Sequence, residues 1–155
     1  MQSGISLKTK ALEYRTTVMA TLLYGAESWT CTQDEYVRFN AFHTKRLRTL
    51  AGKKRDEIRN ADLLKLARMR PLENYVRYYR LRLAGHVRRM DDSRLPKKVL
   101  FGELAGGSRG RRCLRKTSMD SLNEDCDHAG IPVSQWVQSI KDRLHSISSL
   151  TSAKK

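Results

Sequence analysis

The sequence predicts an all-α fold, a small helical bundle followed by a looser helical C-terminal extension. Apolar residues recur at spacings of three, four and seven along most of the chain, which is the period of a helix with one buried face. Residues that favour helix ends stand at the borders of these segments. A length of 155 residues fits one domain, or one domain and a tail.

The first predicted helix runs from about Leu7 to Leu23. Leu12, Met19 and Leu23 are spaced by seven and four residues and form its apolar stripe. Gly25 is expected to end this segment, because glycine adopts a positive φ without strain. Three further apolar residues lie beside the stripe: Ala11, Val18 and Leu22.

The second predicted helix begins with a capping box. Thr32 is followed three residues later by Glu35, so each side chain can bond the backbone N–H of the other. The helix is expected to reach Ala51 and to stop at Gly52. Its predicted buried face comprises Tyr36, Phe39, His43, Leu47 and Leu50.

A charged loop, 53–59, separates this helix from two more. Asn60 is the expected N-cap of a short helix through Arg68. Pro71 fits the first turn of a long helix. Gly85 in its middle predicts a close helix crossing, and the adjacent His86 is expected at the buried edge in a structural role. The predicted buried side carries Leu72, Val76, Tyr79, Leu83, Val87 and Met90.

The pattern breaks after this helix, at the Asp91-Asp92-Ser93 turn and again at Pro96. Residues 99–101 are short enough to be extended, and a helix is expected from about Lys116 to Ala129. A last helix carries Trp136, Ile140, Leu144 and Ile147. We therefore expect three parts: a helical bundle over 1–92, a basic Gly/Arg-rich linker over 93–116, and a helical extension over 117–155.

Positive charge is concentrated in the middle of the chain. The net charge is +15, and the segment from Arg38 to Lys116 alone holds 24 Lys/Arg against 7 Asp/Glu, or +17. The rest of the chain therefore sums to −2. Such a concentration favours a polyanionic partner, with nucleic acid first and an anionic membrane surface second. The alternative is a solvated surface that serves solubility only.

Several of these cations are predicted to contact phosphates. Arg70, Arg77 and Arg88 are spaced by seven and eleven residues, so they share one face of a helix. Tyr75 and Tyr78 flank them, either as stacking platforms for bases or as packing residues. The full predicted set is Lys45, Arg46, Arg48, Arg70, Arg77, Arg80, Arg88, Arg109, Arg111, Arg112, Arg115 and Lys116.

No catalytic constellation is predicted. The only adjacent aspartates, Asp91 and Asp92, lie in a turn with no strand pair to present them to metal ions. Cys113, Cys126 and His128 lack zinc-ligand spacing, so no metal or other cofactor is expected. Three cysteines without close pairs fit a reducing compartment, nuclear or cytoplasmic. The sequence contains no run of 18 apolar residues, and no membrane partner is expected.

Three segments together resemble the region downstream of the palm in non-LTR, LINE-like (RTE-type) retrotransposon reverse transcriptases. They are 7–29, ending in Leu-Leu-Tyr-Gly-Ala-Glu-Ser-Trp; 80–90, Arg-Leu-Arg-Leu-Ala-Gly-His-Val-Arg-Arg-Met; and 94–97, Arg-Leu-Pro-Lys. The resemblance implies a thumb-like helical bundle that grips template–primer or element RNA. It also implies that the Mg²⁺-binding aspartates belong to a palm that these segments do not include.

The chain departs from the family pattern at three positions, one of which is the tryptophan missing after Asp142-Arg143. Arg112 follows Arg109-Gly110-Arg111 where the family has proline, and Ser118 stands where an aromatic residue is expected. The resemblance, together with the concentrated positive charge, implies a non-enzymatic fragment of an endonuclease–reverse transcriptase that binds RNA, DNA or an RNA–DNA hybrid. The alternative is a non-functional or domesticated helical fragment that only associates with protein, either a palm domain or a second copy through exposed apolar surface. An independent nuclease is the least favoured alternative.

Overall fold

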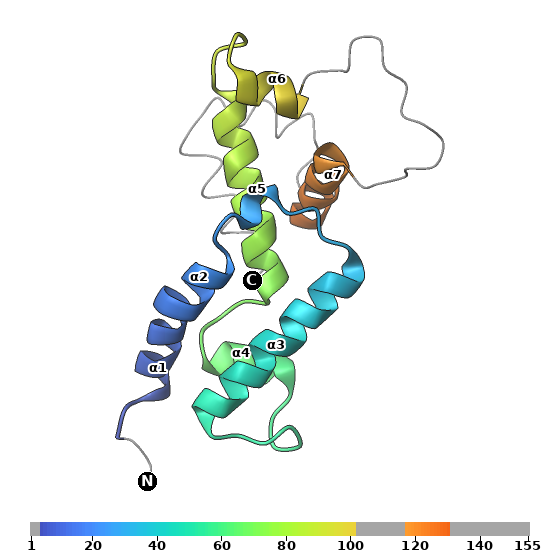
Figure 1. Ribbon diagram of the computed structural model, residues 1–155. Coiled ribbons are helices and arrows are strands. Elements are labelled where there is room, and N and C mark those ends of the chain that lie inside the picture. The colour runs from blue at the N-terminus through green and yellow to red at the C-terminus, as the bar shows by residue number, and fades with distance from the viewer. Residues whose placement is uncertain (1–3, 102–116, 131–155) are drawn as a thin grey trace. The chain divides into compact units, whose positions relative to one another are not determined.

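The computed structural model describes residues 4–101 and 117–130 (Figure 1). These residues form helices and turns without a strand, so the predicted all-α class is confirmed. In this part of the chain no helix combines the length and apolar character needed to cross a membrane. The elements are α1 (Leu7–Tyr14), a π-helical turn (Arg15–Met19), α2 (Ala20–Leu22), a 3₁₀ turn (Ala26–Ser28), α3 (Gln33–Ala51), α4 (Asn60–Leu66), α5 (Leu72–Arg88), α6 (Leu95–Phe101) and α7 (Ser118–Ala129).

The chain divides into two compact units. Unit 1 comprises Met1–Ala26 and Cys31–Val76, and unit 2 comprises Glu27–Thr30 and Arg77–Lys155. The division falls inside α5, so this helix contributes its first turn to unit 1 and the remainder to unit 2. The sequence placed a boundary near residue 92, after the end of the same helix. The expected last helix, with Trp136, lies outside the described residues.

A π-helical turn changes which face of the first helical segment is buried. Ala11 and Tyr14 are buried before the turn, and Met19 and Leu23 are buried after it. The step from Tyr14 to Met19 is five residues, because a π turn holds one residue more than an α turn. Leu12, predicted to belong to the stripe, is therefore 50% exposed, and that prediction was wrong. Gly25 adopts a φ of 72° after the segment, as expected.

Helix α3 has the predicted bounds and caps. The Thr32 hydroxyl accepts from the Glu35 N–H at 3.4 Å, and the Thr32 N–H donates to the Glu35 carboxylate at 2.7 Å. Gly52 follows the last helical residue with a φ of 64°. The predicted inner face is confirmed: Tyr36, His43 and Leu47 are buried, and Phe39 and Leu50 are half-buried.

Helix α4 begins one residue earlier than predicted, because Asn60 is its first residue rather than its cap. Arg59 is the N-cap and makes no side-chain capping bond. The Asn60 side-chain oxygen instead accepts a hydrogen bond from the Arg48 guanidinium at the end of α3. Helix α4 ends at Leu66, and Arg68 has a φ of 53°, a left-handed conformation that non-glycine residues rarely adopt.

The start of α5 is capped by a residue of α3. The Asn40 side-chain oxygen accepts from the Leu72 N–H at 2.8 Å, and its amide nitrogen donates to the Glu73 carboxylate at 3.3 Å. A helix start leaves its first N–H groups without intrahelical partners, and Asn40 satisfies one of them. This contact joins two elements of unit 1.

The core of unit 2 lies between α5 and α7. Leu81 and Ala84 of α5 pack with Leu122 and Cys126 of α7. Three partly buried residues cover this cluster: Leu100, Phe101 and Met119. The expectation that residues 99–101 are extended was wrong, because they form the end of α6. Pro96, expected to break the pattern, is the second residue of this helix, where its missing N–H costs no hydrogen bond.

Candidate nucleic-acid interface

Most of the exposed positive charge of unit 1 lies at the end of α3, in the following turn and in α4. Residues 45–70 contain ten Lys/Arg and three Asp/Glu, a net charge of +7. Nine of the ten cations are exposed, and Arg48 is half-buried. We call the nine the basic surface of unit 1: Lys45, Arg46, Lys53, Lys54, Arg55, Arg59, Lys65, Arg68 and Arg70.

Short-range contacts hold the elements of the basic surface together. Helix α4 packs against α3 (Figure 1), and the bond from Arg48 to Asn60 joins the end of α3 to the start of α4. The connecting residues form a turn in which the Glu57 N–H donates to the Lys54 carbonyl at 3.3 Å. Hydrogen bonds therefore fix the turn that carries these cations, both within it and between the two helices that flank it.

Acidic side chains engage two of the nine cations. Lys53 lies 3.4 Å from Glu57, and Lys65 lies 4.0 Å from Asp62. The Arg46 guanidinium stacks on the Phe42 ring, 5.4 Å from its centroid. Apart from Arg46 and Arg70, the remaining five exposed cations take part in no ion pair with another described residue: Lys45, Lys54, Arg55, Arg59 and Arg68.

A buried histidine joins three segments of unit 1. His43 of α3 contacts the Tyr14 hydroxyl through Nδ1 and the Arg70 carbonyl through Nε2, each at 3.2 Å. A carbonyl can only accept, so Nε2 carries the hydrogen and Nδ1 accepts from Tyr14. The Tyr14 and His43 rings stack with centroids 5.7 Å apart.

Burial determines the titration of this pair. Desolvation lowers the pKa of His43 below its ordinary value, against the opposing effect of the bond to the Arg70 carbonyl. Desolvation also raises the pKa of Tyr14, and the nearby charge of Arg46 opposes that shift. His43 is therefore a neutral structural residue at neutral pH. Arg70 is exposed, while its backbone carbonyl is bonded inside the unit.

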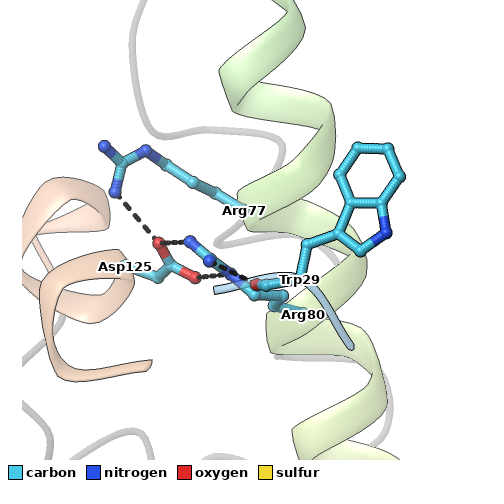
Figure 2. Close-up of polar contacts among 4 residues, drawn as sticks. All are labelled: Trp29, Arg77, Arg80 and Asp125. Carbon is cyan, nitrogen blue, oxygen red and sulfur yellow. Dashed lines mark hydrogen bonds and ion pairs between the residues drawn. The ribbon is translucent and has the colours of Figure 1, made fainter. Parts of the chain in front are cut away.

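Two of the predicted phosphate-binding residues, Arg77 and Arg80, lie in the interior of unit 2 around Asp125 (Figure 2). Arg80 donates to both carboxylate oxygens, from Nε to Oδ2 at 2.8 Å and from Nη2 to Oδ1 at 2.7 Å. Arg77 Nη1 reaches Oδ1 at 2.9 Å. Arg80 Nη1 also donates to the Trp29 carbonyl at 2.8 Å, while the Trp29 indole points away from the carboxylate.

This arrangement gives Arg77 and Arg80 a structural role. The Asp125 side chain is fully buried, and those of Arg77 and Arg80 are 11% and 4% exposed. Desolvation raises the pKa of Asp125, although the hydrogen bonds and charges of Arg80 and Arg77 oppose the shift. A phosphate would have to displace a carboxylate that already accepts a bidentate bond. We therefore remove these two arginines from the candidate phosphate ligands.

The predicted face of Arg70, Arg77 and Arg88 is not one exposed surface. Arg77 is buried, while Arg88 is exposed at the end of α5 and stacks on Phe101 at 5.4 Å. His86, expected at the buried edge, is exposed, and that prediction was wrong. Tyr75 and Tyr78 are half-buried. The Tyr75 hydroxyl accepts a long bond from the Arg70 N–H at 3.5 Å, which fits a packing role.

The adjacent aspartates hold the corner between α5 and α6. The Asp91 carboxylate accepts from the Ser93 N–H at 2.8 Å, and bonding to Ser93 lowers the pKa of Asp91. Lys97 lies 2.6 Å from Asp92 and donates to the Met90 carbonyl at 2.7 Å. These contacts are those of a local turn.

The residues considered for zinc do not form a site in the described part of the chain. Over residues 4–101 and 117–130, no group of three or more His, Cys, Asp or Glu is placed to hold a metal ion. Cys126 is buried, and burial together with the neighbouring Asp125 and Asp127 raises its pKa to about 11, so its thiol is protonated at neutral pH. His128 is exposed. Cys113 lies outside the described residues.

Five predicted phosphate ligands also lie outside the described residues: Arg109, Arg111, Arg112, Arg115 and Lys116. Comparison of the whole chain with protein-family models, curated proteins and solved structures finds no match.

Proposed function

We propose that the protein binds nucleic acid with little sequence preference, through phosphate contacts of the basic surface of unit 1. The observation that carries this proposal is the group of five exposed cations without an acidic partner among the described residues, gathered over 45–68. Lysine and arginine side chains release condensed counterions when they neutralise phosphates, and this requires no contact with bases.

The resemblance in sequence supports a more specific form of the proposal. In that form the chain is a thumb-like part of a retrotransposon reverse transcriptase and grips a template–primer duplex or element RNA. The polymerase and endonuclease chemistry, with its Mg²⁺ ions, belongs to other parts of such a protein. The chain alone is then a binding module, and primer extension by the isolated chain would contradict this form.

Salt dependence provides the test. Five contacts to a single strand predict a slope of log K against log salt of about −3.5, so a fourfold rise in salt weakens binding about a hundredfold. We expect this slope for a labelled single-stranded RNA and a somewhat steeper one for an RNA–DNA hybrid, because each contact to a duplex releases more counterions. Both are measured by fluorescence anisotropy with the full chain. An affinity that is flat over that range would contradict the proposal.

A double variant with a matched control locates the site. Lys54→Gln with Arg55→Gln removes two exposed cations from the turn, and we expect the salt slope to become shallower by about 1.4. The control, Arg15→Gln with Arg38→Gln, removes two exposed cations of the same unit outside the basic surface. Equal effects of the two variants would mean that net charge, rather than this surface, determines binding.

One observation favours association with protein as a second candidate function. Leu95 and Val99, one helical turn apart on α6, are 71% and 75% exposed. An exposed apolar pair of this kind is typical of a contact surface. We expect Leu95→Ser with Val99→Ser to abolish any oligomer seen by light scattering. A wild-type chain that stays monomeric at all concentrations would oppose self-association by this pair.

A further inference from the structure

The outward face of the unit 2 part of α5 carries a row of polar and aromatic residues that lies outside the basic surface of unit 1. Tyr78, Arg82 and His86 follow one another at intervals of four residues, and Arg89 stands in the turn just after the helix. Intervals of four place side chains above one another on one helix face. We call these four residues the α5 stripe.

The core of unit 2 explains why this face points outward. Arg80, Leu81, Ala84 and Val87 are buried on the other side of the helix, around Asp125 and against α7. Arg82, His86 and Arg89 are all exposed, and Tyr78 is half-buried. The internal ion pair therefore holds the helix in the rotation that presents the stripe to solvent.

The aromatic end of the stripe is supported by a second ring. Tyr78 lies against Tyr79, with ring centroids 5.8 Å apart and planes at 60°. Both rings are half-buried, so each is held on one side and retains some exposed surface. A positioned ring loses little conformational entropy when a flat ligand group stacks on it.

We propose that the α5 stripe is a second nucleic-acid site, which takes a single strand with its phosphates along Arg82, His86 and Arg89 and an unpaired base on Tyr78. This inference rests on the proposed function and adds a site with its own strand preference. The helical rise from Tyr78 to His86 is about 12 Å, a length that extends over several nucleotides rather than one.

The chemistry of the stripe favours a single strand over other polyanions. Base–aromatic stacking needs an unpaired base, which a duplex does not offer, and it tolerates any base because each has a π face. An anionic membrane surface would favour large apolar side chains among the cations, and the stripe has none. Guanidinium groups form paired hydrogen bonds to phosphate oxygens.

The test compares two pairs of unit 2 substitutions of equal charge in the full chain. Arg82→Gln with Arg89→Gln changes the stripe, and Arg94→Gln with Lys98→Gln removes two exposed cations from the α5–α6 corner and α6. The probes are a short oligouridylate and its oligodeoxythymidylate counterpart. With both probes we expect the salt slope of the stripe variant to become shallower by about 1.4. The control should change the slope by less than half as much.

The aromatic contact is tested with an abasic strand of the same length. Tyr78→Leu keeps an apolar side chain but removes the ring, and we expect about tenfold weaker binding of the oligouridylate with no change for the abasic strand. Tyr78→Phe keeps the ring and should bind as the wild type does. If Tyr78→Leu fails to fold, photocrosslinking of a bromouridine strand to the wild-type chain should map to Tyr78.

The outcomes separate this inference from the proposed function. If the Lys54/Arg55 variant reduces the salt slope while the stripe variant does not, the basic surface of unit 1 stands and the stripe is refuted. A wild-type chain that binds no strand refutes both. Equal loss on abasic and normal strands for Tyr78→Leu, crosslinks confined to other residues, or equal competition by anionic vesicles would also overturn the stripe.

Discussion

Removing the charge of Asp125 is expected to destabilise unit 2 strongly. Its carboxylate accepts three hydrogen bonds from Arg77 and Arg80, at 2.7–2.9 Å, and its side chain is fully buried. Asp125→Asn keeps the shape but leaves two guanidinium groups in the interior without a counter-charge. Breaking a buried pair in this way costs about 3–5 kcal/mol, against a total stability of about 5–15 kcal/mol for a typical domain.

The appropriate assay resolves the two units separately. Amide hydrogen exchange in α7 and in the second half of α5 reports on unit 2, and exchange in α3 reports on unit 1. A loss of about 3 kcal/mol corresponds to exchange faster by about a hundredfold in α7. Asp127→Asn, two residues further along the same helix and exposed, provides the matched control and should change exchange little. A cost below about 1 kcal/mol for Asp125→Asn would refute the reasoning.

Three further predictions concern single residues. Burial holds the pKa of His43 below its ordinary value, so the unfolded chain takes up a proton at a higher pH than the folded chain does. Unit 1 should therefore lose stability as the pH falls from about 7 to 5. In urea melts this loss should be smaller for His43→Gln, and equal dependence of stability on pH in the two proteins would contradict the prediction. Ser121 is fully buried, and its hydroxyl has no hydrogen-bond partner among the described residues. Ser121→Ala should therefore stabilise unit 2 by about 0.5–1 kcal/mol, measured by hydrogen exchange. A loss of stability would contradict this prediction. Arg68→Gly should stabilise unit 1 by about 0.5–1 kcal/mol by relieving its positive φ, whereas Arg68→Ala, which removes the same charge, should not.

Local signals allowed most helix ends to be predicted. The capping box of Thr32 and Glu35 and the glycines at 25 and 52 depend on contacts within a few residues, so the sequence displays them directly. The start of α4 was displaced because Asn60 bonds Arg48, twelve residues earlier, instead of its own helix. The π turn was not predicted, because a single five-residue step is not visible against an expected period of 3.6 residues.

The candidate site was predicted less completely than the fold. Concentrated charge in the middle of the chain pointed to the segments around Arg46 and Arg70, and both residues are exposed. Spacing alone could not tell Arg77, which is buried, from Arg82, which is exposed. The missed signal was the position of the apolar residues: Leu81, Ala84 and Val87 mark the inward side of α5 and thereby place Arg82 and His86 outward.

By itself, the sequence determined the helical class, the caps of α3 and the excess of positive charge in the middle of the chain, because propensity, capping and net charge are properties of neighbouring residues or of composition. Only the tertiary structure decided which arginines remain available to a partner. Asp125 is 45 and 48 residues from the two arginines that it binds, and a pairing over that distance depends on how α7 packs against α5. Burial follows from that packing, so the same residue type is an internal ion-pair partner at position 80 and an exposed cation at position 82.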